Sequence, residues 1–342
     1  MLCSGDSMLN KITEKYKESE FYEWLKVTLP QLQYTKWLKK LPLDESAILL
    51  ESHNGNEVYG SVFYLLKELV TNDDYKQYNI YLTCKEANKD KFKKILSLKG
   101  FKNVTLVPFG SKQYMKLLAS AKYIMADVSM SPMFVKKEGQ VYLNTWHGTP
   151  LKTLGKKVNG SAHSIGNVQK NFVCADFLLY PNEYTKKHMV EDYMLENIAH
   201  GKSILAGYPR NTAFFDEEKS KKIIKDLELE GKRIYAYMPT WRGVVGRINK
   251  SASVYLKYYL YEIDDALSDD EILYVNVHPL AAKDVDFSVF KHIRNFPAEY
   301  ETYEFLNCAE CLVTDYSSVF YDYAISRKKV ILFTCNLKIY FV

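Results

Sequence analysis

The chain has 342 residues, 47% of them hydrophobic and 25% charged, which excludes a disordered protein and is typical of one large domain or two smaller ones. Its 46 basic and 41 acidic side chains give a formal charge of +5, and their even spread argues against a nucleic-acid-binding protein. No apolar run is long enough to predict a transmembrane helix, and the N-terminus lacks the apolar core of a signal peptide. We therefore expect a cytoplasmic protein with no nucleic-acid partner.

Residues 1–44 are predicted to form an amphipathic helical segment that precedes the main fold. Aromatic and aliphatic side chains alternate there with lysines and glutamates, and Pro30 is expected to interrupt the helix or to start a second one. Two interpretations stay open at this point. The segment packs on the main domain, or it lies in a membrane interface.

From residue 45 onward, short apolar runs alternate with helical patterns, which predicts parallel sheets covered by helices on both faces. Strands are expected over 47–52, 78–83, 104–107, 122–127, 140–146, 177–182, 203–209, 233–240, 272–279, 292–297, 310–315 and 329–334. Helices are expected over 57–70 and 89–100, from Ser111, and near 253–267. A charged helix over 214–233 separates two predicted Rossmann-like domains, 45–215 and 216–342.

Four polar clusters each follow a predicted strand. They are "TWHGTPLK" from Thr145, "MPTWRG" from Met238, "HPL" from His278 and "DYSSVFYD" from Asp315. In open α/β sheets, ligands bind beyond the carboxyl ends of the strands, so four clusters at such ends predict a binding site. His53, which follows the first strand, is a further candidate for the same cleft.

The residue types in these clusters suit the handling of phosphate. His147 titrates near neutral pH and can take a proton from an attacking hydroxyl, and Gly148 lets the backbone approach a ligand. Arg242 can bind phosphate with two N–H groups, and Ser317 and Ser318 open a predicted helix whose first N–H groups favour anions. Taken alone, each has an ordinary structural interpretation, such as a hydrogen-bonded core histidine or a helix cap.

The cysteines and acidic pairs do not predict a metal site. Cys308 and Cys311 form a lone pair with no second pair or histidine partner, and we expect reduced, structural thiols. Asp284 and Asp286 lie in a charged loop. We expect neither a metal ion nor a cofactor.

The segments "WHGTPLKTLGK", "AGYPRN", "MPTWRG", "NVHPL" and "TDYSSVFYDYA" resemble, in that order, the CDP-glycerol glycerophosphotransferases of teichoic acid and capsule synthesis. The resemblance covers roughly residues 45–335. It implies a GT-B fold, in which two doubly wound domains face a cleft, and a peripheral enzyme on the cytoplasmic face of the membrane. It also implies transfer of glycerol phosphate from CDP-glycerol to a lipid-linked or polyol-phosphate acceptor, with release of CMP.

Carried over by motif, the resemblance makes His147 the general base and His278 a stabiliser of the transferring phosphate. The first domain would then serve the acceptor and the second the nucleotide donor. The residues expected to line the donor site are His147, Gly148, Thr149, Pro150, Leu151, Arg210, Thr240, Trp241, Arg242, Asn276, Val277, His278, Ser317, Ser318 and Asp322.

The chain ends soon after its last predicted strand, where members of the family continue, so we expect an incomplete second domain. Two other functions stay open: a GT-B glycosyltransferase that uses a nucleotide sugar, and a non-catalytic remnant. The sequence also leaves open CDP-glycerol against CDP-ribitol as donor, priming against polymerisation, the acceptor, and the oligomeric state.

Overall fold

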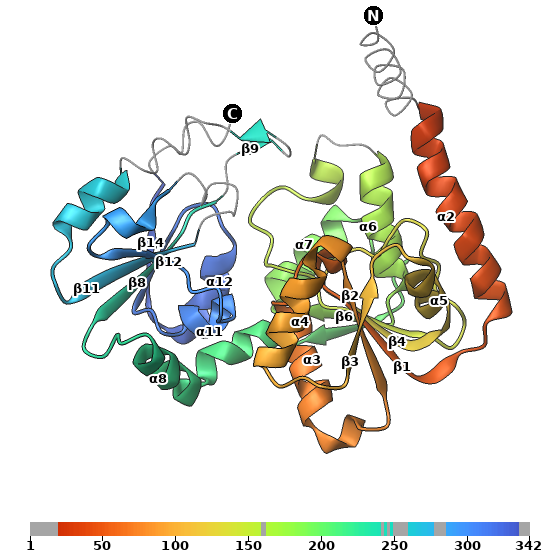
Figure 1. Cartoon of the computed structure of the whole chain (residues 1–342). Helices are drawn as coiled ribbons and strands as arrows, with labels where there is room; N and C mark the ends of the chain where they lie inside the picture. Colours follow the sequence, from red (N-terminus) through yellow and green to blue (C-terminus); the bar gives the residue numbers. More distant parts are fainter. Residues whose placement is uncertain are drawn as a thin grey trace, which may run out of the picture. The chain divides into compact units, whose positions relative to one another are not determined.

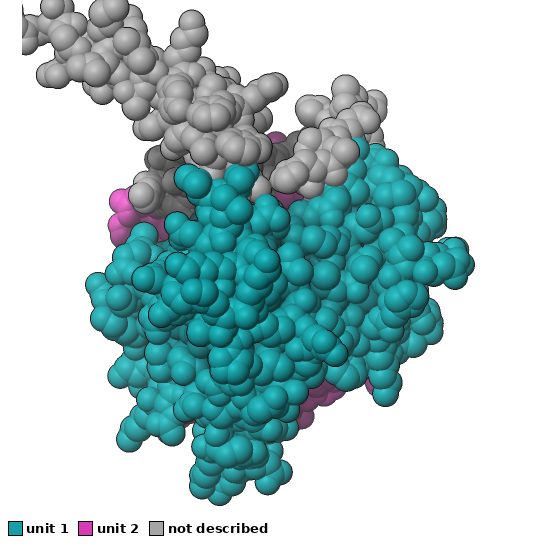
Figure 2. Space-filling view, turned by 90° about the vertical axis from the view of Figure 1, so that its right-hand side faces the viewer, with its two compact units in different colours: residues 1–58, 65–147, 155–206 teal, residues 59–64, 148–154, 207–342 magenta. Residues whose placement is uncertain are grey.

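The computed structural model describes residues 20–158, 162–240, 243–244, 247–248, 259–276 and 285–334 (Figure 1). The chain folds into two compact units, drawn in teal and magenta in Figure 2. Unit 1 comprises residues 1–58, 65–147 and 155–206, and unit 2 comprises residues 59–64, 148–154 and 207–342. Both units are α/β folds built on a parallel sheet, as predicted.

From residue 20, where the described part of the N-terminal segment begins, the chain forms helix α2 (Glu20–Lys40), which runs through Pro30. The predicted interruption at Pro30 is therefore wrong. Proline lacks the N–H of one helical hydrogen bond, but the second half of α2 packs on α5 (Lys112–Ser120), and Tyr34 is buried there. The Tyr34 hydroxyl donates a hydrogen bond to the carbonyl of Val135 at 2.6 Å, which fixes the helix to unit 1.

Unit 1 has a seven-stranded parallel sheet with the order β3-β2-β1-β4-β5-β6-β7. Its strands are β1 (Asp44–Glu51), β2 (Asn79–Cys84), β3 (Val104–Pro108), β4 (Ala121–Ala126), β5 (Val141–Asn144), β6 (Phe177–Tyr180) and β7 (Lys202–Leu205). The helices α3 (Ser61–Thr71), α4 (Lys89–Leu98), α5, α6 (Ala162–Cys174) and α7 (Glu183–Asp192) connect them. The sequence did not specify α6 and α7, because polar residues weaken their apolar periodicity.

The strand order in unit 1 reverses between β1 and β4. The chain moves outward from β1 to β2 and β3 and then returns to place β4 on the other side of β1. The connections that leave β1 and β4 therefore diverge to opposite sides, which opens a crevice at the carboxyl ends of these two strands. This is the topological switch point, where ligands of doubly wound sheets bind.

Unit 2 has a five-stranded parallel sheet with the order β12-β11-β8-β13-β14. Its strands are β8 (Arg233–Met238), β11 (Glu271–Val275), β12 (Ile293–Asn295), β13 (Cys311–Thr314) and β14 (Lys329–Leu332). Helix α8 (Glu217–Asp226), the 3-10 helix η5 (Pro209–Phe215) and the short helices α11 (Thr302–Leu306) and α12 (Val319–Tyr323) belong to this unit, and residues 259–266 are also helical. A small antiparallel hairpin, β9 (Gly243–Val244) with β10 (Arg247–Ile248), was not predicted.

Alternate side chains of β8 enter two different hydrophobic clusters. Ile234 and Ala236 pack with Leu312 and Phe305, whereas Tyr235 and Tyr237 pack against a second cluster that contains Leu273. Both faces of the central strand are thus covered, which explains its nearly continuous apolar sequence. The switch point of this sheet lies between β8 and β13, which are neighbours although distant in sequence.

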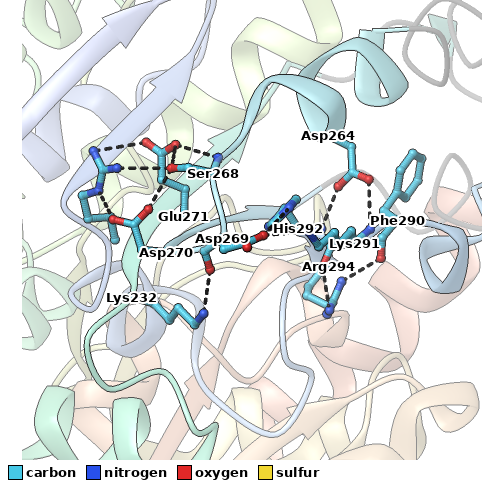
Figure 3. Close-up of polar contacts among 11 residues, drawn as sticks. Lys232, Asp264, Ser268, Asp269, Asp270, Glu271, Phe290, Lys291, His292 and Arg294 are labelled. Atoms are coloured by element: carbon cyan, nitrogen blue, oxygen red, sulfur yellow. Dashed lines mark hydrogen bonds and ion pairs between the residues drawn. The ribbon is translucent and has the colours of Figure 1, made fainter.

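A network of charged side chains lies at the amino-terminal edge of the sheet in unit 2 (Figure 3). Arg233, at the start of β8, contacts Asp270 at 3.0 Å and Glu271 at 3.2 Å. Asp264 accepts hydrogen bonds from the backbone N–H groups of Lys291 and His292. Because this edge is opposite the carboxyl ends of the strands, we assign the network to strand alignment rather than to ligand binding.

Candidate active site

His147 stands just beyond the carboxyl end of β5 and is exposed. The chain turns there because Asn144 accepts a hydrogen bond from the N–H of Trp146 at 2.9 Å and Trp146 adopts a left-handed conformation, with φ 53°. A left-handed backbone is unfavourable for a large side chain, so the surrounding packing must hold it. The Trp146 ring is buried, stacks on the His147 ring at 4.1 Å and packs on Phe172 at 5.2 Å.

A hydrogen bond to its Nδ1 orients the His147 ring and defines its tautomer. Its Nδ1 lies 2.9 Å from the backbone carbonyl oxygen of Asp127. A carbonyl oxygen only accepts hydrogen bonds, so Nδ1 carries the proton and Nε2 carries the lone pair in the neutral ring. This is the arrangement that a general base needs.

Asp127 is the residue of this site that the sequence did not single out. It follows β4 directly and is buried, and its carboxylate accepts hydrogen bonds from the Ser52 hydroxyl at 2.7 Å and from the N–H of His53 at 3.0 Å. The His53 Nδ1 lies 3.5 Å from the same carboxylate. Its only sequence signal is its position after a strand, which gains meaning once β4 is known to neighbour β1.

These contacts place His53, Asp127 and His147 together at the switch point of unit 1. The His53 and His147 ring centroids are 5.7 Å apart. Burial would raise the pKa of the Asp127 carboxyl, but the hydrogen bonds and charge of His53 and the Ser52 hydroxyl outweigh it and lower the pKa below its usual range. Asp127 is therefore a carboxylate at neutral pH.

The switch point of unit 2 is built in a similar way. Asp315 follows β13, and one carboxylate oxygen accepts hydrogen bonds from the N–H of Thr240 at 2.7 Å, from its hydroxyl at 2.6 Å and from the N–H of Tyr316 at 2.7 Å. Thr240 comes two residues after the end of β8. In each sheet, an aspartate after one strand thus holds the segment that follows its neighbour.

Unit 2 also brings the "WHGTP" and "DYSS" motifs together. An added Cβ at Gly148 would lie 3.0 Å from the Ser318 Oγ, so this position accepts a side chain only if its neighbour moves. The Tyr208 hydroxyl also lies near the backbone of Gly148, and burial raises the pKa of this phenol. The segments that contain Tyr208 and Ser318, about 60 and 170 residues further along the chain, therefore both lie beside Gly148.

Arg210 and Asp322, both predicted to contact the donor, are buried and bonded to each other. The Arg210 Nη2 lies 2.7 Å from the Asp322 Oδ2, and its Nε lies 3.2 Å from the same oxygen. Tyr303 donates a further hydrogen bond to this oxygen at 2.8 Å, and Asn211 donates to the other oxygen at 3.3 Å. The pair joins η5 to α12, and direct contact of either residue with the donor stays a prediction.

The remaining predicted site residues fall into two groups. Thr149 and Pro150 are buried, Leu151 is exposed, and Asn276, Ser317 and Ser318 are partly exposed after β11 and β13. Trp241, Arg242, Val277 and His278 lie outside the described residues, as does Asp284. The predicted convergence of two histidines on one ligand thus rests on a residue that the structure does not describe.

Within the described part of the chain, no cluster of three or more histidine, cysteine or acidic side chains could hold a metal ion. Cys308 and Cys311 are buried free thiols, and burial raises the pKa of each. The described helices include none that is both long and apolar enough to cross a bilayer.

Comparison with known proteins gives a consistent match. The family model described as CDP-glycerol:poly(glycerophosphate) glycerophosphotransferase matches residues 33–341. The teichoic acid poly(glycerol phosphate) polymerase of Bacillus spizizenii is 25% identical over 313 residues, which are 88% of this chain and 76% of that protein. The polymerase of the same description from Bacillus subtilis is 24% identical over 317 residues, and the chain spans only 40% of its length.

Among solved structures, that of the wall teichoic acid polymerase TagF superposes with a TM-score of 0.74 at 22% identity. The match covers 97% of this chain and 80% of that one. At this identity it establishes the fold, that of two Rossmann-like domains, and no more.

Proposed function

This chain belongs to the CDP-glycerol:poly(glycerophosphate) glycerophosphotransferase family, and from that premise we propose its reaction and the residues that perform it. The enzyme transfers glycerol phosphate from CDP-glycerol to a hydroxyl of a lipid-linked or polyol-phosphate acceptor and releases CMP. The product is a teichoic acid or a capsular polysaccharide.

One observation carries the assignment of the general base. His147 is exposed at the switch point of unit 1, and its Nδ1 donates to the carbonyl of Asp127, which leaves the lone pair on Nε2. The acceptor hydroxyl gives its proton to Nε2, and its oxygen forms a bond to the phosphorus that bears the glycerol. The bond from this phosphorus to the bridging oxygen breaks, and its electron pair leaves with CMP.

The donor site is assigned to unit 2. Gly148 and Ser318 meet there, and Asp315 holds Thr240 beside the end of β8, so backbone N–H groups and hydroxyls are gathered at one sheet edge. Such groups favour the diphosphate of a nucleotide. In this proposal, Arg242 and His278 provide positive charge near the transferring phosphate.

Contact with the cytoplasmic face of the membrane is assigned to α2 and its neighbour α5. On α2, Leu29 and Leu32 are 52% and 63% exposed. The Trp37 ring has three ammonium groups beside it, those of Lys36, Lys112 and Lys116, at 5.8, 5.7 and 4.7 Å from its centroid. Apolar side chains bordered by lysines favour a surface of anionic lipid.

The reaction is tested by CMP release from CDP-glycerol in the presence of a polyol-phosphate acceptor. We expect His147→Gln to lower kcat by at least about 100-fold, because loss of a positioned general base costs this much, while CDP-glycerol still binds. A variant that keeps its rate would remove His147 from the chemistry. Turnover of CDP-ribitol in place of CDP-glycerol would change the donor and keep the mechanism.

A further inference from the structure

A second imidazole stands beside the proposed base, and the reaction as stated does not use it. His53 follows β1, its side chain is 44% exposed, and its ring centroid is 5.7 Å from that of His147. The two residues are distant in sequence and come from the ends of β1 and β5. Their closeness is therefore produced by the strand order.

His53 is oriented by buried polar groups. Its N–H donates to the Asp127 carboxylate at 3.0 Å, and its Nδ1 lies 3.5 Å from that carboxylate and 3.3 Å from the Ser52 hydroxyl. The Ser52 hydroxyl donates its own proton to Asp127 at 2.7 Å, so Nδ1 of His53 is the donor in its contacts. The second ring N–H of a protonated His53 is then Nε2–H.

The backbone that carries the His53 ring is strained. His53 and Asn54 have φ values of 46° and 54°, and a Cβ on the following Gly55 would come within 2.9 Å of the backbone of Cys84 and Lys85. A left-handed backbone is unfavourable for a residue other than glycine. A partly exposed ring recovers little of this cost by packing, which favours a role in binding.

We propose that His53, with Asp127 as its counter-ion, binds the phosphate group next to the reacting hydroxyl of the acceptor. This inference rests on the proposed function, because it names what the acceptor presents to His147. A buried carboxylate beside Nδ1 favours the protonated ring, whose Nε2–H then donates to an anionic oxygen. His53 would thus select an acceptor that ends in glycerol phosphate over a neutral polyol.

The spacing of the two rings fits such an acceptor. In a glycerol phosphate terminus, the free hydroxyl and the phosphate are on neighbouring or next-neighbouring carbons. The hydroxyl can therefore meet Nε2 of His147 while a phosphate oxygen meets the ring of His53, since the rings are separated by only 5.7 Å. His147 remains the base, and His53 recognises the charge.

The test compares two soluble probes, an alkyl phosphoglycerol diester and the uncharged alkyl glyceryl ether of the same chain length. Binding of each probe is measured by calorimetry to the wild-type chain, to His53→Gln and to the control His200→Gln. His200 is an exposed histidine of the same unit. The His53→Gln variant keeps a polar side chain of similar size, and circular dichroism checks its folding.

We expect His53→Gln to weaken binding of the diester by about tenfold or more, since a hydrogen bond to a charged group contributes about 1.5–3 kcal/mol. Binding of the ether should change less than about twofold, and His200→Gln should change neither. Asp127→Asn, which keeps the carbonyl that holds His147, should weaken diester binding in the same direction. In turnover assays, both variants should raise the KM for the diester and leave the KM for CDP-glycerol unchanged.

Equal affinity of wild type and His53→Gln for the diester would overturn the proposal, as would equal losses for the diester and the ether. If the wild-type chain binds the diester through His53 but releases no CMP from CDP-glycerol, the proposed reaction fails and the anion site stands.

Discussion

Gly148 lies so close to Ser318 that a side chain at position 148 would crowd the serine. We expect Gly148→Ala to lower the free energy of unfolding by about 1 kcal/mol, because the new Cβ would lie 3.0 Å from the Ser318 Oγ. Adding Ser318→Ala should recover most of this loss, since the remaining Cβ is 3.8 Å away. Urea unfolding of the two single variants and the double variant measures the coupling. Additive losses would show that the two residues do not press on each other.

The site residues differ in how far the sequence reveals them. His147 and Gly148 could be predicted, because a histidine, a glycine and lysines after a strand are unusual in a core. Asp127 could not, because a single aspartate after a strand has no motif and gains its role only through the neighbouring strand β1. Arg210 and Asp322 were each predicted to meet the ligand, and sequence alone does not show that they meet each other.

At the scale of elements, the ion pair between Arg210 and Asp322 joins η5 to α12. Both side chains are buried, so removal of the cation leaves an unpaired carboxylate in a dry environment. We expect Arg210→Met to destabilise the protein by about 3–5 kcal/mol. Arg233→Met is the matched control, because Arg233 is exposed and its ion pairs with Asp270 and Glu271 contribute little (Figure 3).

Chemical denaturation of both variants measures the difference. If Arg210→Met unfolds at the same urea concentration as wild type, the buried pair has no net role in joining η5 to α12, and its residues become stronger candidates for contact with the donor.

The lipid-facing role of α2 is also a prediction at this scale. We expect Leu32→Glu to reduce binding to phosphatidylglycerol-containing vesicles by about tenfold, because burial of one leucine contributes about 1.5–3 kcal/mol. Leu98→Glu on α4 is the control, since Leu98 has the same 63% exposure on another helix. Vesicle co-sedimentation compares the two variants with wild type. Equal loss in both would point to a general effect of charge instead of a docking face.

The elements themselves were predictable where one rule dominates. Alternating apolar runs and helical patterns gave the parallel strands, because a strand buried on both faces must be apolar throughout. The predicted interruption at Pro30 was wrong because the packing of α2 on α5 outweighs a single missing hydrogen bond. The hairpin of β9 and β10 was missed because two-residue strands carry no periodicity.

On the scale of the whole molecule, both units have the same arrangement at their switch points, an aspartate that holds the segment after the neighbouring strand. Asp127 holds the residues that follow β1, and Asp315 holds the residue that follows the end of β8. Strand order in each sheet separates the connections at that point, and an aspartate fixes the backbone that remains beside the crevice. A sequence read in chain order cannot show this repetition, because each partner is 70 or more residues from its aspartate.

Each unit also contains a buried carboxyl group whose pKa is raised by its burial. Burial raises the pKa of Glu51 in unit 1 to about 7, although the Tyr114 and Thr83 hydroxyls offset part of the effect. Burial likewise raises the pKa of Glu301 in unit 2 to about 7, against the hydrogen bonds it accepts from the N–H groups of Tyr303 and Glu304. Both groups are therefore more protonated in the folded chain than in the unfolded chain between pH 4.5 and 7.

The sign of the pH dependence follows from this difference. A group whose pKa is raised by folding contributes stability that is fully present below its unfolded pKa and is lost as the pH rises through its folded pKa. Each of these two carboxyls should thus remove on the order of 1–3 kcal/mol of stability between pH 5 and 8. On the acid side, hydrogen bonds from Arg233 and Ser268 lower the pKa of Asp270 to about 2, so the small contribution of this exposed group is lost as the pH drops below 4.

We therefore expect the midpoint of thermal unfolding to be highest near pH 5 and to decline toward pH 8. Glu51→Gln and Glu301→Gln replace each acid by a neutral side chain of the same shape, so each should raise the midpoint at pH 8 and leave it almost unchanged at pH 5. Circular dichroism melts of wild type, both single variants and the double variant across this range measure the effect. Because the two carboxyls belong to different units, each variant should flatten the decline independently of the other. Midpoints that rise steadily from pH 5 to pH 8 in wild type would mean that neither carboxyl is protonated in the folded chain.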